Sequence, residues 1–436
     1  MQPEDLVAHE LVQCRAEGVD VSAVEAIWRE TGGSTTPSAD GTSDDPRLRT
    51  VARELLDELD RMSDAHRRAE PAAAEPDAWD GIMAQWGPLP ALPRRAAPDR
   101  VHGAWLGRAA GCLLGKPVEG ISRLGIEELA RGTGNWPIRD YFTAVGLPAA
   151  IAQRWPLKRE NLVENVRGMP EDDDLNFTML ALSLVELHGD QLTTEDVAAA
   201  WLANLPAARL FTAERAAYRN LLDAVPVSRA AEIRNPFREW IGALIRTDAY
   251  GWTHPGDPAT AARIAYADAR LSHRRSGIYG ALLVAAMSAA AIVCDDVATV
   301  IECGLAVVPP RSRLADAVRL GVELAELPLD RALDALHAAY DGLHWVHVLN
   351  NTALIAYALT SSRADFSSAI GAAVAGGLDT DSAGATVGAI SGALAGAVAL
   401  PERWTAPLHN RIASSLPGFD GIAIDELARR TVVVVS

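Results

Sequence analysis

Apolar residues recur at helical spacing through most of the chain after residue 100. Positions that return every three or four residues fall on one face of a helix, so this pattern predicts a mainly helical region. Runs of alternating β-branched residues, which would indicate strands, are nearly absent apart from the terminal TVVVV. The pattern therefore predicts an all-α fold class. With prolines and glycines as boundaries, the predicted helices are 101–114, 174–188, 194–203, 258–271, 277–303, 311–325, 329–340, 350–360 and 383–399.

The first hundred residues have a different pattern. Two short helices are expected over 4–16 and 22–31, followed by the polar linker GGSTTPSADGTSDDP at 32–46. Apolar residues at helical spacing from Leu48 to Met62 then predict one amphipathic helix that ends near Arg68. Proline-rich connectors lead from this helix to the main region. We predict two parts: a helical N-terminal appendage with linkers at 1–98, which packs on or covers the rest, and a compact multi-helix domain at 99–436.

The run GGLDTDSAGATVGAISGALAGAVAL at 376–400 joins two aspartates to a stretch of small residues. Four of its glycines recur every fourth residue, which gives one smooth helix face that a second helix can approach closely. One interpretation is a transmembrane helix, since about 18–20 residues just span a bilayer. Ala and Gly are only weakly apolar, however, and no comparable second span exists. We therefore favour a buried central helix, whose N-terminal turn carries Asp379, Asp381 and Ser382.

A second glycine stripe, Gly107, Gly111 and Gly115, has the same four-residue spacing. We expect the helix that bears it to be the packing partner of the stripe from Gly384 to Gly396. Bulky side chains would then be excluded at both stripes.

Composition and charge narrow the classes of function. The chain has 436 residues and a net charge of −17, which argues against a nucleic-acid surface, because binding to phosphates requires clustered Lys and Arg. The four cysteines show no CxxC pair or disulfide framework. The start, MQPEDLVAHELVQ, lacks the basic and apolar segments of a signal peptide. We expect a cytoplasmic protein that binds neither nucleic acid nor membrane; the oligomeric state stays open.

Acidic residues gather at three places where a helix begins or ends. Glu119 follows a proline turn, Glu171, Asp172, Asp173 and Asp174 precede an apolar helix, and Asp379 and Asp381 begin the small-residue run. Helix capping is the simplest explanation, since an N-terminal Asp accepts hydrogen bonds from free backbone N–H groups. One cap needs one acid, however, and adjacent carboxylates repel unless cations or protons relieve them. An oxygen-only ligand set of this kind favours Mg²⁺, Mn²⁺ or Ca²⁺ over zinc.

These stretches resemble the motifs of the ADP-ribosylglycohydrolase family, in particular its dinitrogenase-reductase-activating glycohydrolase type. The similar stretches are GAWLGRAAGCLLGKPVEG at 103–120, EDDDLNFTMLAL at 171–182 and GGLDTDSAGATVGAISGA at 376–393, in the family's order. The similarity extends over roughly residues 100–432. It implies an all-α, ADP-ribosylglycohydrolase-like domain with two divalent cations, Mg²⁺ or Mn²⁺. It also implies a hydrolase that cleaves the bond between ADP-ribose and its acceptor.

The resemblance assigns roles to individual residues. The implied metal ligands are Asp172, Asp173, Asp174, Asp379, Asp381 and Ser382. The implied catalytic carboxylates are Glu119, Asp172 and Asp379. Weaker similarity at 271–290 and 345–359 adds residues near the substrate. With those from the motifs, the expected substrate-binding residues are Glu119, Gly120, His273, Gly277, Tyr279, Asn350, Asn351 and Gly377.

Alternatives stay open for several of these roles. His273 could cap helix carbonyls, and Asn350 and Asn351 could be helix N-caps. Which carboxylate acts as the general base is not assigned. Leu378 is inserted before Asp379, and Ser382 replaces the family's threonine. The substrate could therefore be an ADP-ribosylated protein side chain, an ADP-ribosylated small molecule, or a small N- or O-riboside. A further alternative is that the protein is a non-catalytic relative of the family that only binds ADP-ribose.

Overall fold

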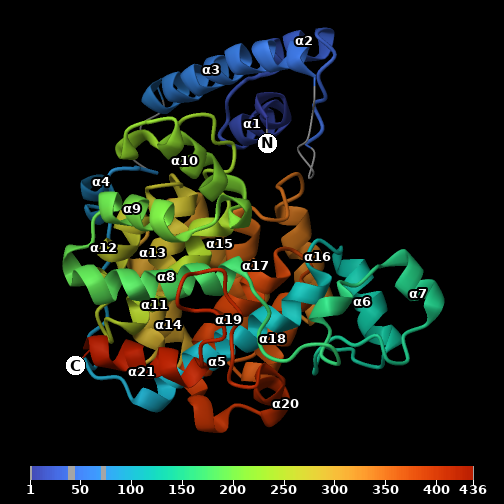
Figure 1. Cartoon of the computed structure of the whole chain (residues 1–436), viewed down its shortest axis with the longest axis vertical. Coiled ribbons are helices and arrows are strands. Elements are labelled where there is room, and N and C mark those ends of the chain that lie inside the picture. The colour runs from blue at the N-terminus through green and yellow to red at the C-terminus, as the bar shows by residue number, and fades with distance from the viewer. Residues whose placement is uncertain (1, 38–44, 70–74, 436) are drawn as a thin grey trace.

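A computed structural model describes residues 2–37, 45–69 and 75–435 (Figure 1). These residues contain 21 α-helices and no β-strand, so the predicted all-α fold class is confirmed. The N-terminal helices are α1 (Pro3–Ala16), α2 (Ser22–Glu30), α3 (Pro46–Ala69) and α4 (Trp79–Met83). The remaining helices are α5 (Pro98–Gly115), α6 (Arg123–Gly132), α7 (Ala149–Arg154), α8 (Asp173–His188), α9 (Thr194–Asn204), α10 (Thr212–Leu222), α11 (Asp248–Trp252), α12 (Pro258–Ala269), α13 (Ser276–Ala291), α14 (Val297–Ala306), α15 (Arg313–Leu324), α16 (Leu329–Ala339), α17 (Val348–Ser361), α18 (Phe366–Ala375), α19 (Thr380–Ala395), α20 (Glu402–Thr405) and α21 (Ile424–Val435).

Helices α5 and α19 form the central pair of the fold and run antiparallel (Figure 1). Their glycines face each other in one register: Gly107 lies against Gly388, and Gly111 lies against Gly384. A β-carbon at any of these four positions would overlap with a backbone carbonyl of the other helix. The expected packing of the two glycine stripes is therefore confirmed. Because α5 ends near Glu119 and α19 begins near Asp381, the same contact brings two acidic turns together.

Nearly every residue of α19 is buried, as the buried-helix interpretation requires. None of the helices in the described part of the chain has both the length and the apolarity to cross a membrane.

The structure departs from the predicted helices at several places. Six helices of the main region were not predicted, namely α6, α7, α10, α11, α18 and α20. Two further departures have a local cause. The region 277–303 is not one helix but two, α13 and α14, because Asp296 accepts a hydrogen bond from the backbone N–H of Thr299 at 2.8 Å and starts α14 anew. The β-branched run TVVVV lies inside α21. There Thr431 accepts a hydrogen bond from the indole N–H of Trp105 in α5 at 3.0 Å, and packing outweighs the weak helix propensity of Val and Thr.

Helices α1 to α3 form a second hydrophobic cluster above the main one (Figure 1). The amphipathic helix predicted from Leu48 onward is α3; part of the predicted linker lies outside the described residues. Phe237 and Trp240 of the main region pack into this cluster. Buried Arg238 also donates to Glu10 of α1 at 2.8 Å and to Glu17 at 2.8 Å. These contacts fix α1 against the main region. The boundary at residue 98 between an N-terminal appendage and a main domain stays a prediction.

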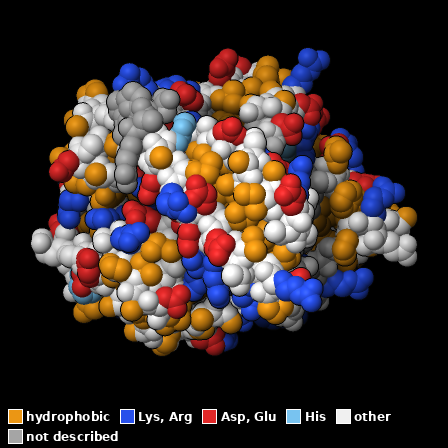
Figure 2. All heavy atoms as spheres, turned by 90° about the horizontal axis from the view of Figure 1, so that it is seen from above, with side chains coloured by type: hydrophobic (Ala, Val, Ile, Leu, Met, Phe, Trp, Pro, Cys, Tyr) orange, Lys and Arg blue, Asp and Glu red, His pale blue; other side chains and the backbone are white. Residues whose placement is uncertain are grey.

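The face that carries α1 to α3 has a mixed surface charge (Figure 2). Lys and Arg side chains there lie among Asp and Glu side chains rather than in one basic area. The absence of nucleic-acid binding stays a prediction.

Candidate metal centre and active-site cleft

A cavity of about 630 Å³ opens over the ends of the central helix pair. Its floor consists of carboxylates from all three acidic stretches, and Ser382 lies among them. Its wall includes aromatic rings and one residue of α1. The acidic floor residues are Glu119, Glu171, Asp172, Asp173, Asp174, Asp379 and Asp381.

Three carboxylates, those of Glu119, Asp379 and Asp381, form the first acidic group. One oxygen from each lies within 4.8 Å of the others. Glu119 follows the short 3₁₀ helix Lys116–Val118, Asp379 is the N-cap residue of α19, and Asp381 lies in the first turn of α19. Thr380 ties this turn to α5 by donating to the carbonyl of Gly115 at 2.9 Å. The first acidic group is therefore held by the same backbone contact as the central helix pair.

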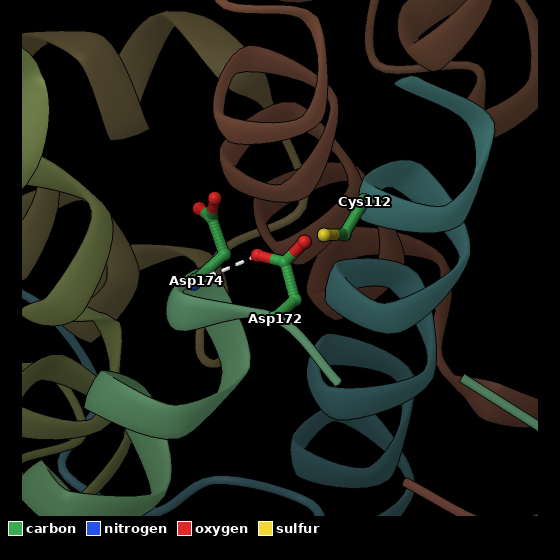
Figure 3. Close-up of side chains that lie close together, drawn as sticks. All are labelled: Cys112, Asp172 and Asp174. Carbon is green, nitrogen blue, oxygen red and sulfur yellow. Dashed lines mark hydrogen bonds between the residues drawn. The ribbon is translucent and has the colours of Figure 1, made fainter. Parts of the chain in front are cut away.

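The second acidic group consists of Asp172, Asp174 and the thiol of Cys112 (Figure 3). Asp172 is the N-cap residue of α8, and its carboxylate lies between Asp174 and the Cys112 sulfur (Figure 3). One oxygen accepts a hydrogen bond from the Asp174 backbone N–H at 2.9 Å. The other pairs with the ammonium of Lys116.

Asp174 joins the second and third acidic stretches. Its carboxylate accepts hydrogen bonds from Ser382 Oγ at 3.1 Å and from Arg108 Nη2 at 3.3 Å. Asp174 thus links residues of α5, α8 and α19 in one buried set of contacts.

Burial and mutual repulsion set the protonation of these acids. Burial, with the charges of Glu119 and Asp172, raises the pKa of Asp381 to about 7. Burial and neighbouring carboxylates also raise the pKa values of Asp173, Asp174 and Asp379 above the ordinary range. So many closely packed carboxylates are typical of sites that hold a cation or bind protons in its absence.

Cation-free protein is expected to lose stability as the pH rises from about 4 to about 7. In that window the folded Asp381 retains its proton, whereas the unfolded carboxyl, with its ordinary value of 3.8, has lost it. The folded state then binds more protons, so the free energy of unfolding falls with pH. Melting temperatures of chelator-treated protein at about pH 5 and pH 8 would check the sign. Asp381→Asn should have the weaker slope, and a slope equal to that of the wild type would contradict this account.

The expected substrate-binding residues fall into two sets. Gly120, Asn350 and Gly377 line a neighbouring groove of about 550 Å³, which shares Trp345 with the acidic cleft. Asn351 lies beneath, where its side-chain oxygen accepts a hydrogen bond from the Asp379 backbone N–H at 3.1 Å. Asn351 therefore positions the acidic turn.

The other set does not line the acidic cleft. His273 is buried, contacts Ser272 Oγ at 2.8 Å and lines a separate pocket. Burial, together with the charge of Arg246, lowers its pKa. Tyr279 is buried and donates to the carbonyl of Pro76 at 2.5 Å. Gly277 allows the Arg238 carbonyl to approach its helix. Of these three residues only His273 comes near a cleft-lining carboxylate, that of Glu214 at 3.8 Å, and none of the three lines the acidic cleft.

Sequence reasoning missed the aromatic wall of the cleft. The rings of Trp240 and His344 stack at 4.2 Å between centroids, and His9 of α1 lies edge-on to Trp240 at 5.8 Å. All three line the cleft together with Phe237 and Trp345. Of these rings, only Trp345 lies in a stretch, 345–359, that carries the family similarity. The others come from segments far apart in sequence, and no local pattern marks them.

Three comparisons with known proteins found similar chains or families. A family model described as ADP-ribosylglycohydrolase matches residues 93–435. An uncharacterized protein of Archaeoglobus fulgidus is 27% identical over 316 residues, which cover 72% of this chain and 92% of that protein. A solved chain described as an ADP-ribosylglycohydrolase-related protein complex covers 78% of this chain and 97% of its own length, at 22% identity and a TM-score of 0.47. The family match begins after α4, so α1 to α4 lie outside it.

Proposed function

Since the chain belongs to the ADP-ribosylglycohydrolase family, we propose that it is a divalent-cation-dependent hydrolase that cleaves the ribosyl glycosidic bond of an ADP-ribosyl or riboside substrate. The observation that carries this proposal is the first acidic group, in which Glu119, Asp379 and Asp381 converge at the floor of the cleft. The dinitrogenase-reductase-activating type stays a prediction.

The first acidic group fits a hard cation. Its donors are all carboxylate oxygens, which Mg²⁺ and Mn²⁺ prefer. Lys158, which pairs with Glu119 at the rim, is the only basic side chain that forms an ion pair with these three acids among the described residues. Asp379 is hydrogen-bonded through its side chain to Asp381, another acid. The negative charge of these three acids therefore exceeds the positive charge of Lys158, and a bound cation would balance it.

A bound cation would supply Lewis-acid polarisation and a template for a ribose and a water molecule. The chain's own carboxylates would do the proton transfer. Asp173 lines the cleft, and no hydrogen bond or ion pair of its carboxylate occurs among the described residues. We therefore assign Asp173 to take the proton of the attacking water and to return it to the leaving group, as the glycosidic bond breaks through an oxocarbenium-like state. Asp172 is less suited to act as this base, because both of its carboxylate oxygens already accept hydrogen bonds.

The cleft wall favours a small substrate over a modified protein. His9 places α1 at the edge of the cleft, and α1 is held there by the buried ion pair of Glu10 with Arg238. A volume of about 630 Å³ lies within the usual range of small-molecule sites, ~300–1,000 Å³. Release of the ribosyl product from free ADP-ribosyl compounds and ribosides should therefore exceed release from ADP-ribosylated protein. The opposite order, with Mn²⁺ present, would contradict this choice of substrate.

Cation binding should be visible in thermal stability. A ligand that binds only the folded state stabilises it, by about 2.7 kcal/mol at 100 times its Kd. Mn²⁺ or Mg²⁺ added to chelator-treated protein should therefore raise the melting temperature by several degrees, and chelator should reverse the rise. Asp223→Asn removes an exposed acid outside the cleft and should respond like the wild type. A melting temperature indifferent to both cations would overturn the metal site.

A further inference from the structure

Every carboxylate oxygen of the second acidic group already accepts a hydrogen bond. Of the two oxygens of Asp172, one caps α8 through the Asp174 N–H at 2.9 Å and the other pairs with Lys116. Of the two oxygens of Asp174, one accepts from Arg108 at 3.3 Å and the other from Ser382 at 3.1 Å. The third member, Cys112, is a buried thiol rather than an oxygen ligand. Two carboxylates already engaged by cationic side chains and a thiol are therefore a poor match for a second hard cation.

Two side-chain cations already neutralise this group. Arg108 is fully buried between Asp174 and Asp248, to whose carboxylate it donates at 2.9 Å. Lys116 has a side chain only 16% exposed, and its partner Asp172 is 1% exposed. A dication beside Asp172 would lie within a few ångströms of the ammonium, and like charges repel strongly in a buried site. The first acidic group has no buried lysine or arginine paired with it in the described part of the chain.

We propose, on the basis of the function proposed above, that the Lys116 ammonium permanently occupies the place of a second metal ion. The chain then binds one divalent cation, at Glu119, Asp379 and Asp381, rather than two. Lys116 belongs to the 3₁₀ helix that connects α5 to Glu119, so the fixed ammonium and the bound cation are held by one short segment. The sequence-based expectation of two cations is thereby replaced by one cation and one ammonium.

The ammonium also has a direct role toward the substrate. An ammonium has three N–H donors, and Asp172 accepts from Lys116 on one side only. Lys116 lines the cleft, so its remaining donors can hold a substrate oxygen beside the cation. This makes Lys116 a substrate-positioning residue of the cleft.

Metal content of the full-length protein tests the proposal. Protein loaded with Mn²⁺, freed of excess ion by gel filtration and analysed by plasma mass spectrometry should retain one Mn²⁺ per chain. Two ions per chain would overturn the role of Lys116 and leave the proposed function standing. No retained ion would overturn both.

A variant pair shows whether Lys116 is the cause. Lys116→Met keeps the length of the side chain and removes its charge, so it should retain two Mn²⁺ per chain. Lys116→Arg keeps the charge and should retain one. The circular-dichroism spectrum of each variant reports the fold, and the wild-type count decides the stoichiometry even if Lys116→Met does not fold. One ion in a folded Lys116→Met would show that Lys116 does not exclude the second cation.

Discussion

Asp381→Asn is expected to abolish hydrolysis while leaving the helices in place. The change removes one of the three carboxylates that hold the proposed cation. The loss should exceed the ~10–100-fold typical of residues that only orient a metal ligand. The fold should survive because the Asp381 side chain accepts a hydrogen bond from the Ser382 backbone N–H at 3.0 Å, which an amide oxygen can also do. Removing one of three repelling acids should not lower the melting temperature of the cation-free protein.

Turnover, calorimetric Mn²⁺ titration and circular dichroism together check this result. Asp223→Asn is the matched control, since it makes the same chemical change at an exposed residue. It should keep wild-type turnover and cation affinity. If Asp381→Asn also keeps wild-type turnover, the ligand assignment is wrong.

Gly388→Leu is expected to leave the protein unstable or insoluble. Even a β-carbon at Gly388 would overlap with the carbonyl oxygen of Gly107 on α5, and backbone cannot move aside as a flexible side chain can. Overpacking typically costs about 1–3 kcal/mol, and branched bulk at a backbone contact should cost at least that. Because α5 and α19 carry the turns of Glu119 and Asp381, any soluble fraction should bind Mn²⁺ weakly.

A pair of Gly→Ala changes separates this contact from glycine replacement in general. Gly388→Ala should lower the melting temperature clearly. Gly87→Ala should change it little, since the nearest atom to its β-carbon would lie 3.8 Å away. Equal melting temperatures for the two variants would contradict the close contact of α5 and α19.

The elements that periodicity describes were predictable from the sequence. The all-α class, the amphipathic helix α3 and the pairing of the glycine stripes all follow from spacing alone. Such spacing places residues on a helix face, and glycines every fourth residue leave few alternatives to close helix contact. The break between α13 and α14 was missed because the apolar pattern runs on through the loop, and Asp296 was not recognised as a cap.

The site was predictable only as far as the motifs extend. The motifs named the acids, and the structure brings Asp174 to Ser382 across 208 positions. Lys116 stands next to Pro117 inside the first motif, so its place was visible, but its pairing with Asp172, 56 positions away, was not. His9 and Trp240 meet through tertiary packing of α1, which no spacing encodes. The charge balance of the site and the shape of the cleft wall could therefore be read only from the folded structure.

Crystals grown with Mn²⁺ and ADP-ribose, measured at an X-ray wavelength where manganese scatters anomalously, test the central claim most directly. We predict one manganese peak in contact with Glu119, Asp379 and Asp381, with the terminal ribose of ADP-ribose lying on it and Lys116 still paired with Asp172. Manganese elsewhere, or ADP-ribose bound away from an empty first acidic group, would contradict the claim.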